Sequence, residues 1–281
     1  MTNALVLAGG GVAGIAWELG VLRGIADADP RLAARILAAD TVVGTSAGSA
    51  VAAQITSGVP LADLYDAQLR AETSEIEVEL HVEELQARFL AAIAGVTSRT
   101  EVLQRIGALA LATETIEPAA RLAAVDARLP VKDWPERDIR LPAVDAVTGE
   151  TVVFTRESGV ALVDAVAASC AVPGVWPPVA IAGRRYVDGG VRSSTNADFA
   201  AGADRVLVVQ PVLADAPSFL GSLADEIEAL KPGEAWMISA DQDSVAAFGT
   251  NPLSPTTRAP SARAGRAIGR AQAAGLSAFW R

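Results

Sequence analysis

The pentapeptide Gly44-Thr45-Ser46-Ala47-Gly48 follows a short apolar run, Thr41 to Val43, and precedes residues 49–55, which have a helix-compatible composition. A G-x-S-x-G motif between a strand and a helix is typical of a nucleophile elbow, the sharp turn that lifts a reactive serine clear of a sheet. The free N–H groups at the start of the following helix favour negative charge near that serine. The same residues also fit an ordinary Gly/Ser turn, so the motif alone leaves both interpretations open.

A second glycine turn lies near the start of the chain. Asn3 to Ala8 has the pattern of a buried strand, Gly9-Gly10-Gly11-Val12-Ala13-Gly14 follows it, and Ile15 to Ala28 has apolar residues at helical spacing. Gly9, Gly11 and Gly14 match the G-x-G-x-x-G fingerprint, which would suggest a dinucleotide-binding oxidoreductase. The N–H groups of such a turn form an anion nest that also suits the oxyanion of an acyl-transfer intermediate.

The two glycine turns are expected to lie together. If the strands that precede them are parallel neighbours, both turns lie at the same edge of the sheet, where open α/β folds bind their ligands. One turn would then supply a nucleophile and the other an oxyanion hole. A dinucleotide site gives no reason for the second turn to be an elbow.

Composition narrows the class of protein. Of 281 residues, 51% are hydrophobic, so a sizeable core is expected, and we predict one α/β domain over residues 1–281. The net charge of −10 argues against a nucleic-acid partner. The single cysteine, Cys170, excludes an intrachain disulfide and a Cys-rich metal cage. The chain has no basic, apolar leader and no apolar run of about 18 residues, so we expect a cytoplasmic protein.

Periodicity and breakers predict the remaining elements. Residues 60–129 are predicted to be mainly helical, and the later chain alternates strands with helices. The predicted strands are Ile139–Val147, Thr151–Thr155, Ile181–Val187, Asp204–Val212 and Ala235–Ser239, and the predicted helices are Val160–Ser169, Phe219–Leu230 and the tail from Ser254.

The only histidine, His81, lies in a stretch where acidic and apolar residues alternate. The alternation favours an extended segment and the composition favours a helix, so both remain open. A solvated acidic face is the ordinary interpretation of the glutamates here, and a metal site is the alternative. These are Glu72, Glu75, Glu77, Glu79, Glu83 and Glu84. The helical region that contains this stretch is also a candidate cap over the mouth of an active site.

A serine nucleophile needs a base, and histidine does not fit that role here. In the α/β-hydrolase order the histidine follows both the serine and the acid, whereas His81 precedes Asp188 and no histidine follows it. Asp188, at the end of a predicted strand and followed by Gly189 and Gly190, is the remaining candidate base. The alternative is a turn aspartate that hydrogen-bonds its own backbone. A carboxylate with a pKa of about 3.9 is a weak base, so such a dyad would depend on its oxyanion hole and helix dipole.

The three motifs at 9–14, 44–48 and 188–190, together with the Ala-Ser-Cys-Ala-Val-Pro-Gly-Val-Trp-Pro-Pro run at 168–178, resemble the patatin-like phospholipase family. The resemblance implies a three-layer α/β/α sandwich with a central, mostly parallel sheet and a helical insertion at about 60–130. It implies a lipid acyl hydrolase of the phospholipase A, lipase or esterase type, with a lipid or ester substrate and no cofactor or metal. By position, Ser46 would be the nucleophile, Asp188 would activate it, and the N–H groups around Gly10, Gly11 and Val12 would form the oxyanion hole.

Some features do not follow from that resemblance. The family usually has Arg or Lys where this chain has Ala13, which makes neutral lipids or simple esters as plausible as phospholipids. The arginine-rich tail with Phe279 and Trp280 predicts either a packed helix or peripheral contact with an anionic membrane. Val172 and Trp176 would lie beside an acyl chain or in the core. A non-catalytic lipid-binding protein would carry the same motifs.

Overall fold

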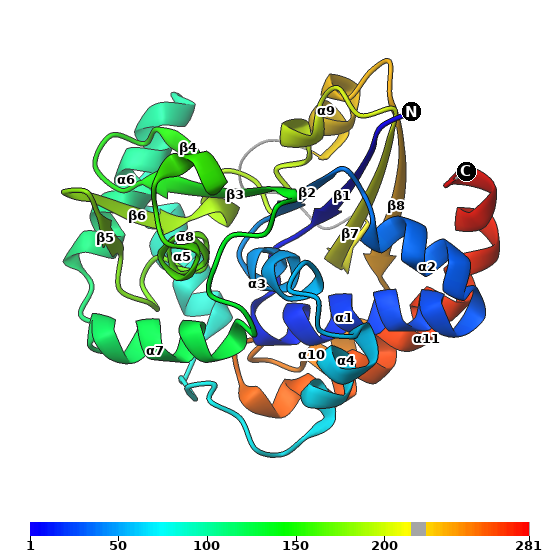
Figure 1. Ribbon diagram of the computed structural model, residues 1–281. Helices are drawn as coiled ribbons and strands as arrows, with labels where there is room; N and C mark the ends of the chain where they lie inside the picture. The colour runs from blue at the N-terminus through cyan, green and yellow to red at the C-terminus, as the bar shows by residue number, and fades with distance from the viewer. Residues whose placement is uncertain (215–222, 281) are drawn as a thin grey trace.

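The computed structural model describes residues 1–214 and 223–280. Its centre is a mixed sheet with helices on both faces, as Figure 1 shows. The strands are β1 (Asn3–Leu7), β2 (Thr41–Gly44), β3 (Asp138–Asp145), β4 (Thr151–Phe154), β5 (Val179–Ile181), β6 (Arg184–Asp188), β7 (Arg205–Leu213) and β8 (Glu234–Ala240). They lie in the order β5-β6-β3-β2-β1-β7-β8, with β4 also paired to β3.

The sheet is parallel through its middle and antiparallel at one end. β1 pairs in parallel with β2 and β7, and parallel pairing continues to β3 on one side and to β8 on the other. The strands β4, β5 and β6 are antiparallel to their neighbours. The prediction of a three-layer sandwich with a mostly parallel sheet is confirmed.

Helices follow most strands and also fill the predicted helical region. They are α1 (Gly11–Ala28), α2 (Pro30–Leu37), α3 (Ala47–Ile55), α4 (Leu61–Leu69), α5 (Val82–Ile93), α6 (Arg99–Ala112), α7 (Pro118–Arg128), α8 (Leu162–Ser169), α9 (Leu223–Ala229), α10 (Gln242–Phe248) and α11 (Arg258–Phe279), with short 3-10 turns η1 (Arg156–Ser158), η2 (Gly189–Val191), η3 (Ala197–Ala200) and η4 (Pro255–Thr257). The predicted helix at 219–230 begins outside the described residues, and α9 is its described part.

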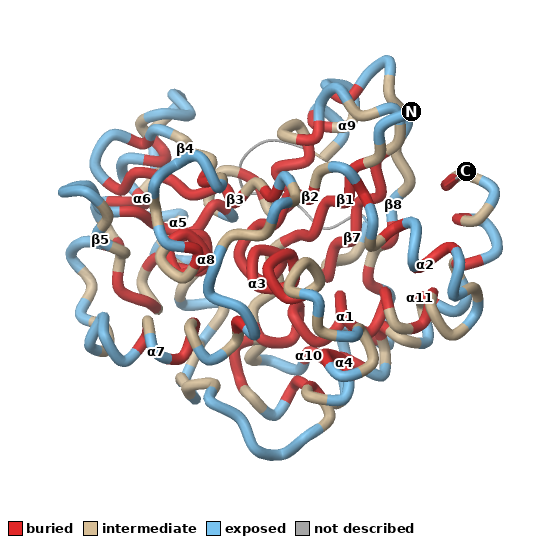
Figure 2. The backbone as a smooth tube through the Cα atoms, viewed as in Figure 1, coloured by how far each residue is buried: buried red, intermediate tan, exposed pale blue. Residues whose placement is uncertain are grey.

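The core lies on both faces of the sheet, as the red segments of Figure 2 show. Leu5 and Leu7 face the layer that contains α1, α3 and α11, whereas Ala4 and Val6 face η3 and α9. At the antiparallel end, α6 packs against β3 and β6. A strand that is covered on both faces has a nearly continuous run of apolar residues. This is why Asn3 to Ala8 could be recognised from the sequence as a buried strand.

One predicted strand is wrong. Residues 181–187 do not form a single strand but belong to an antiparallel hairpin of β5 and β6. Ala182 and Gly183, which separate the two strands, both have positive φ, at 49° and 81°. Two successive residues with positive φ form the tight turn of a two-residue hairpin, whose twist matches that of the flanking strands. The chain therefore reverses direction within a run that the sequence pattern predicts as one strand.

The stretch with alternating acids is extended, but it is not a strand. Residues 72–81 have no regular secondary structure, and α5 begins at Val82. The interpretation of the six glutamates as a solvated acidic face is wrong for Glu75. Its side chain is buried and accepts hydrogen bonds from Arg128 Nε and Nη2 at 2.7 and 2.5 Å. The partner comes from α7, more than 50 residues later, and the local sequence does not reveal it.

The C-terminal helix α11 packs lengthwise on α1. Glycines allow a close backbone approach on both helices: a Cβ at Gly20 would lie 2.2 Å from Ala262 O, and a Cβ at Gly269 would lie 2.0 Å from Val21 O. Ion pairs join the exposed side of this interface, where Arg266 and Arg270 meet Asp27. The prediction that the tail forms a packed helix is confirmed.

We predict that Gly269→Ala lowers the free energy of unfolding by about 1–3 kcal/mol, because the added methyl group would force the two helix backbones apart. Urea unfolding followed by circular dichroism measures the change. Gly275→Ala in the same helix is the matched control, because its Cβ would meet only the ring of Trp236, at 3.0 Å. Equal stability of Gly269→Ala and wild type would show that the close approach is not needed.

Candidate active site

Ser46 lies at the turn between β2 and α3 in a strained backbone conformation. Its φ of 52° and ψ of −114° are rare for a residue with a side chain, and such strain costs about 1–3 kcal/mol and clusters at functional sites. The turn is also crowded, because a Cβ at Gly48 would lie 2.1 Å from Leu7 O and one at Gly44 would lie 2.5 Å from Gly48 O. The pentapeptide is therefore an elbow and not an ordinary Gly/Ser turn.

Hydrogen bonds from three side chains hold this elbow from behind. The Ser46 N–H donates to Ser169 Oγ at 3.0 Å, and the Ser46 carbonyl accepts from Ser49 Oγ at 2.6 Å and from Cys170 Sγ at 3.1 Å. Ser169 and Cys170 belong to the 168–178 run, so that run holds the backbone of the Ser46 turn in place. The sequence motif gave no indication of this role, because the contact spans more than 120 residues.

The first glycine turn lies directly beside the elbow. A Cβ at Gly9 would lie 3.5 Å from Ser46 Cβ, and Gly48 N–H donates to Ala8 O at 3.0 Å. The Gly9 and Gly14 N–H groups are already used, since they donate to Ser194 O and Gly10 O at 2.8 Å each.

Three N–H groups remain at the start of α1. Those of Gly10, Gly11 and Val12 have no hydrogen-bond acceptor within the described ranges 1–214 and 223–280. Unsatisfied N–H groups of a first helical turn attract negative charge. The two glycine turns therefore lie together, as the spacing of the strands that precede them predicts, and the first turn carries these three N–H groups.

Asp188 reaches the same place from the opposite direction. Its strand, β6, is antiparallel to β3, and Asp188 is in register with Ala143. β3 pairs with β2 only as far as Arg140, and its later part, which also pairs with β4, pairs with β6 at Ala143 to Asp145. The position of Asp188 at the ligand edge thus depends on the extra length of β3, and not on a parallel strand end.

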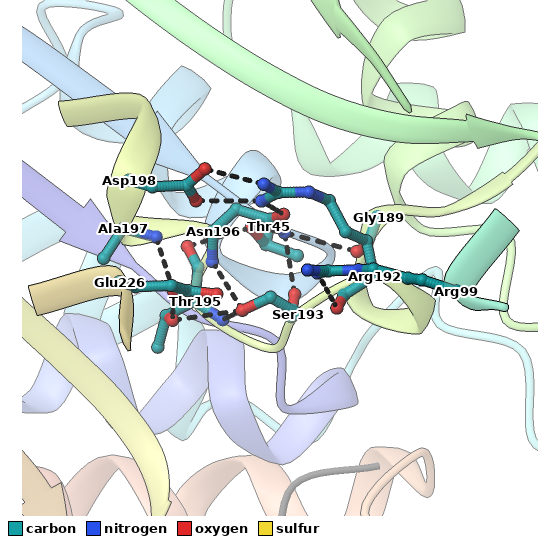
Figure 3. Close-up of polar contacts among 10 residues, drawn as sticks. All are labelled: Thr45, Arg99, Gly189, Arg192, Ser193, Thr195, Asn196, Ala197, Asp198 and Glu226. Atoms are coloured by element: carbon teal, nitrogen blue, oxygen red, sulfur yellow. Dashed lines mark hydrogen bonds and ion pairs between the residues drawn. The ribbon is translucent and has the colours of Figure 1, made fainter. Parts of the chain in front are cut away.

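Asn196 ties the elbow to the Asp188 turn. Its side-chain amide donates to Thr45 Oγ1 at 3.1 Å, to Gly189 O at 3.2 Å and to Ser193 O at 2.7 Å. Figure 3 shows this network, in which Glu226 also accepts from Thr195 Oγ1 and from the Ala197 N–H. Asn196 is buried and adopts a left-handed conformation, with φ at 49°. Sequence reasoning missed Asn196, and only its position shortly after the Asp-Gly-Gly turn could have pointed to it.

A mainly apolar pocket of about 370 Å³ opens over Ser46 and Asp188. Leu80, Val82, Leu85 and Phe89 line it from the start of the helical insertion, and Ile106 lines it from α6. We call this cavity the apolar pocket. The region at 60–130 therefore does cover the site, as its position suggests, and Val172 lies in the pocket wall while Trp176 is buried.

Burial changes the acidity of the aspartate. Asp188 is only 4% exposed, and this desolvation raises its pKa from 3.8 to about 6. The Ser46 side chain, the hydrogen bond from the Gly190 N–H and the charge of Arg121 act in the opposite direction and limit the rise. The two side chains selected from the sequence, Ser46 and Asp188, line the same pocket.

His81 takes no part in this arrangement. It precedes α5, is 58% exposed, and pairs with Glu79 at 3.2 Å. It is absent from the lining of the apolar pocket. The described ranges contain no group of three or more His, Cys, Asp or Glu residues that could hold a metal ion.

The strained Ser46 turn thus lies beside free N–H groups and lines an apolar pocket. A family model described as "Patatin-like phospholipase" matches residues 5–201, more than half of the sequence. The chain belongs to the patatin-like phospholipase family. The matched range includes the first glycine turn, and the matched family is a phospholipase family and not a dinucleotide-binding one.

Comparison with solved structures finds VipD from Legionella pneumophila, with 12% identity and a TM-score of 0.49 over 98% of this chain and 67% of that one. It also finds the type III effector protein ExoU, with 15% identity and a TM-score of 0.36 over 95% of this chain and 53% of that one. A complex of SpcU with ExoU from Pseudomonas aeruginosa gives 15% identity, a TM-score of 0.35 and coverages of 95% and 52%.

The chain spans about half to two thirds of the length of these structures. Comparison with curated protein sequences gives no match. Within residues 1–214 and 223–280, no helix has both the length and the hydropathy needed to cross a membrane.

We predict that Asp188→Asn stabilises the folded protein at about pH 7.5 by about 2–3 kcal/mol. An acid whose pKa is higher in the folded protein than in the unfolded chain opposes folding once it ionises, so the cost develops between 3.8 and about 6 and persists above that range. Urea denaturation of both proteins at about pH 7.5 and about pH 4 provides the comparison, with the lower pH as the internal control. A difference that does not depend on pH would contradict the buried carboxylate.

Proposed function

We propose that this protein is a serine acyl hydrolase that cleaves carboxylic esters of lipids through a Ser46–Asp188 dyad. The observation that carries the proposal is that the strained Ser46 and the buried Asp188 line the same apolar pocket, together with Gly10 and Gly11 at the start of α1. Membership of the patatin-like phospholipase family supports the substrate class.

In the first half of the reaction, Ser46 Oγ attacks the ester carbonyl carbon while its proton passes to a carboxylate oxygen of Asp188. The carbonyl oxygen becomes an oxyanion and accepts hydrogen bonds from the N–H groups of Gly10, Gly11 and Val12. The bond to the alcohol then breaks, and Asp188 returns the proton to the leaving oxygen. The alcohol departs and the acyl group stays on Ser46 as an ester.

In the second half, Asp188 removes a proton from a water molecule, whose oxygen attacks the acyl carbonyl carbon. The same N–H groups hold the second oxyanion. When the bond to Ser46 Oγ breaks, the proton on Asp188 passes to that oxygen and restores the serine. The products are a carboxylic acid and the free enzyme. A base with a pKa near 6 suits this work better than an ordinary aspartate, because its basicity lies closer to the working pH.

We expect Ser46→Ala to lower kcat for p-nitrophenyl esters by at least about 10³-fold, because no other nucleophile lies at this position. Wild-type rates are expected to rise with acyl length, about fourfold for each methylene that enters the apolar pocket. His81→Ala is the control and is expected to stay within about twofold of wild type. Turnover retained by Ser46→Ala would reject the nucleophile, and a folded but inactive wild type would favour the lipid-binding alternative.

The pH dependence gives a separate test of the base. Because Asp188 must be ionised to accept a proton, we expect kcat/KM to rise tenfold per pH unit at low pH and to level off above about pH 6. Asp188→Asn is expected to lower the plateau by about 10²–10⁴-fold, since an amide cannot take the proton. A pH profile that instead follows His81, and is lost in His81→Ala, would contradict the dyad.

A further inference from the structure

A second cavity, of about 330 Å³, lies where the ends of several elements meet, and we call it the polar pocket. Its walls come mainly from the C-terminal ends of α3, α4 and α7, from the extended chain that follows α4, and from the start of α11 (Figure 1). Small-molecule sites typically have volumes of about 300–1,000 Å³. The charged side chains that line the polar pocket are Arg70, Glu72, Glu75, Arg128 and Arg258.

Arg258, the first residue of α11, is a buried cation in this wall and is only 8% exposed. Its guanidinium donates from Nε to Gln68 Oε1 at 3.2 Å, from Nη1 to Arg70 O at 3.2 Å and from Nη2 to Ala67 O at 2.5 Å. These acceptors are neutral oxygens at the C-terminal end of α4, where a positive charge is favourable. The three bonds leave two of the five N–H groups of the guanidinium for a ligand.

The arginines of the polar pocket are not all balanced by acids. Glu75 is already engaged in a two-pronged ion pair with Arg128. Neither Arg70 nor Arg258 forms an ion pair with any residue of 1–214 or 223–280, and Glu72, the other acid of the lining, is exposed. A buried charge without a partner of opposite sign is costly. The pocket therefore favours an anionic ligand.

We propose that the polar pocket binds a phosphate group, carried by a soluble phosphate ester or by a phospholipid headgroup, and that Arg70 and Arg258 contact its oxygens. The planar fork of guanidinium N–H groups matches the geometry of phosphate oxygens. A phosphate monoester carries about −1.5 to −2 charges at pH 7, which suits two arginines that lack a carboxylate partner. Thr73 and Ser74 add hydroxyl groups to the same lining.

The polar pocket is separate from the apolar pocket over Ser46. The two cavities have no lining residue in common, and a side chamber of about 10 Å³, room for about one water molecule, adjoins both. The side chamber shares Ile15 and Arg128 with the polar pocket and shares Ser46 with the apolar pocket. It is too small for an acyl chain or a phosphate group to pass. The inference therefore goes beyond the proposed hydrolysis and does not rest on it.

The first test is isothermal titration calorimetry of the full chain with inorganic phosphate and with glycerol 3-phosphate. We expect saturable binding that weakens by at least about tenfold in Arg258→Gln and in Arg70→Gln, because each change removes a charged hydrogen-bond donor. Arg263→Gln is the matched control and is expected to stay within about twofold of wild type, since surface charges at a distance are screened. Arg263 is an exposed residue of α11 that does not line the polar pocket.

Arg70→Gln keeps the test decisive if Arg258→Gln does not fold, as judged by circular dichroism. Arg70 is exposed, and its side chain makes no hydrogen bond within the described part of the chain, so its replacement is expected to leave the fold intact. Acetate is titrated as the comparison anion. Acetate binding as tight as phosphate binding would reject the assignment to phosphate.

The second test distinguishes the two sources of the phosphate group. Co-sedimentation of the protein is measured with phosphatidylcholine vesicles that contain or lack phosphatidic acid. Binding that requires phosphatidic acid and is lost in Arg70→Gln but kept in Arg263→Gln would assign the phosphate to a lipid headgroup. Binding of glycerol 3-phosphate without such vesicle binding would assign it to a soluble ester.

The site would be overturned if inorganic phosphate, glycerol 3-phosphate and the phosphatidic acid vesicles all failed to bind. Unchanged binding in Arg70→Gln would overturn it as well. Equal weakening in Arg263→Gln would show a general attraction to the surface charge of the protein and would reject the pocket as the site. Each of these measurements is independent of ester turnover, so failure of the proposed hydrolysis and failure of the phosphate site give different results.

Discussion

The contact between the end of β1 and Gly48 is the constraint on which the site depends. The Gly48 N–H donates to Ala8 O at 3.0 Å, and its Cα lies so near Leu7 O that any Cβ would collide with that oxygen. Parallel pairing of β1 with β2 then places both glycine turns at one edge of the sheet. Without that close approach the elbow would lie farther from the free N–H groups of α1, and the two turns could not form one site.

Hydrogen bonds hold the polar groups of the site in place inside apolar surroundings. Asn196 joins the two turns that carry Ser46 and Asp188, and Ser169, Ser49 and Cys170 fix the backbone of the elbow. The burial of Asp188 within these surroundings raises its pKa to about 6.

Much of the site could be found in the sequence, for a local reason. Glycines beside a reactive side chain mark places where the backbone is crowded, and such crowding is visible in consecutive residues. Asn196 and the Glu75–Arg128 pair could not be found in this way, because each joins residues that lie far apart along the chain. The hairpin of β5 and β6 was also missed, since Ala182 adopts positive φ without the residue type that announces it.

The sequence by itself determined the three turns, the buried strands, the exclusion of His81 from a triad order and the choice of Ser46 and Asp188. It could do so because turn geometry and strand burial depend on neighbouring residues and on periodicity. Only the tertiary structure decided that Asp188 arrives on a strand antiparallel to β3, beyond the part of β3 that pairs with β2, and that α5 and α6 line the pocket. Register, burial and charge pairing join residues that are distant in the chain, and these set the acidity of Asp188.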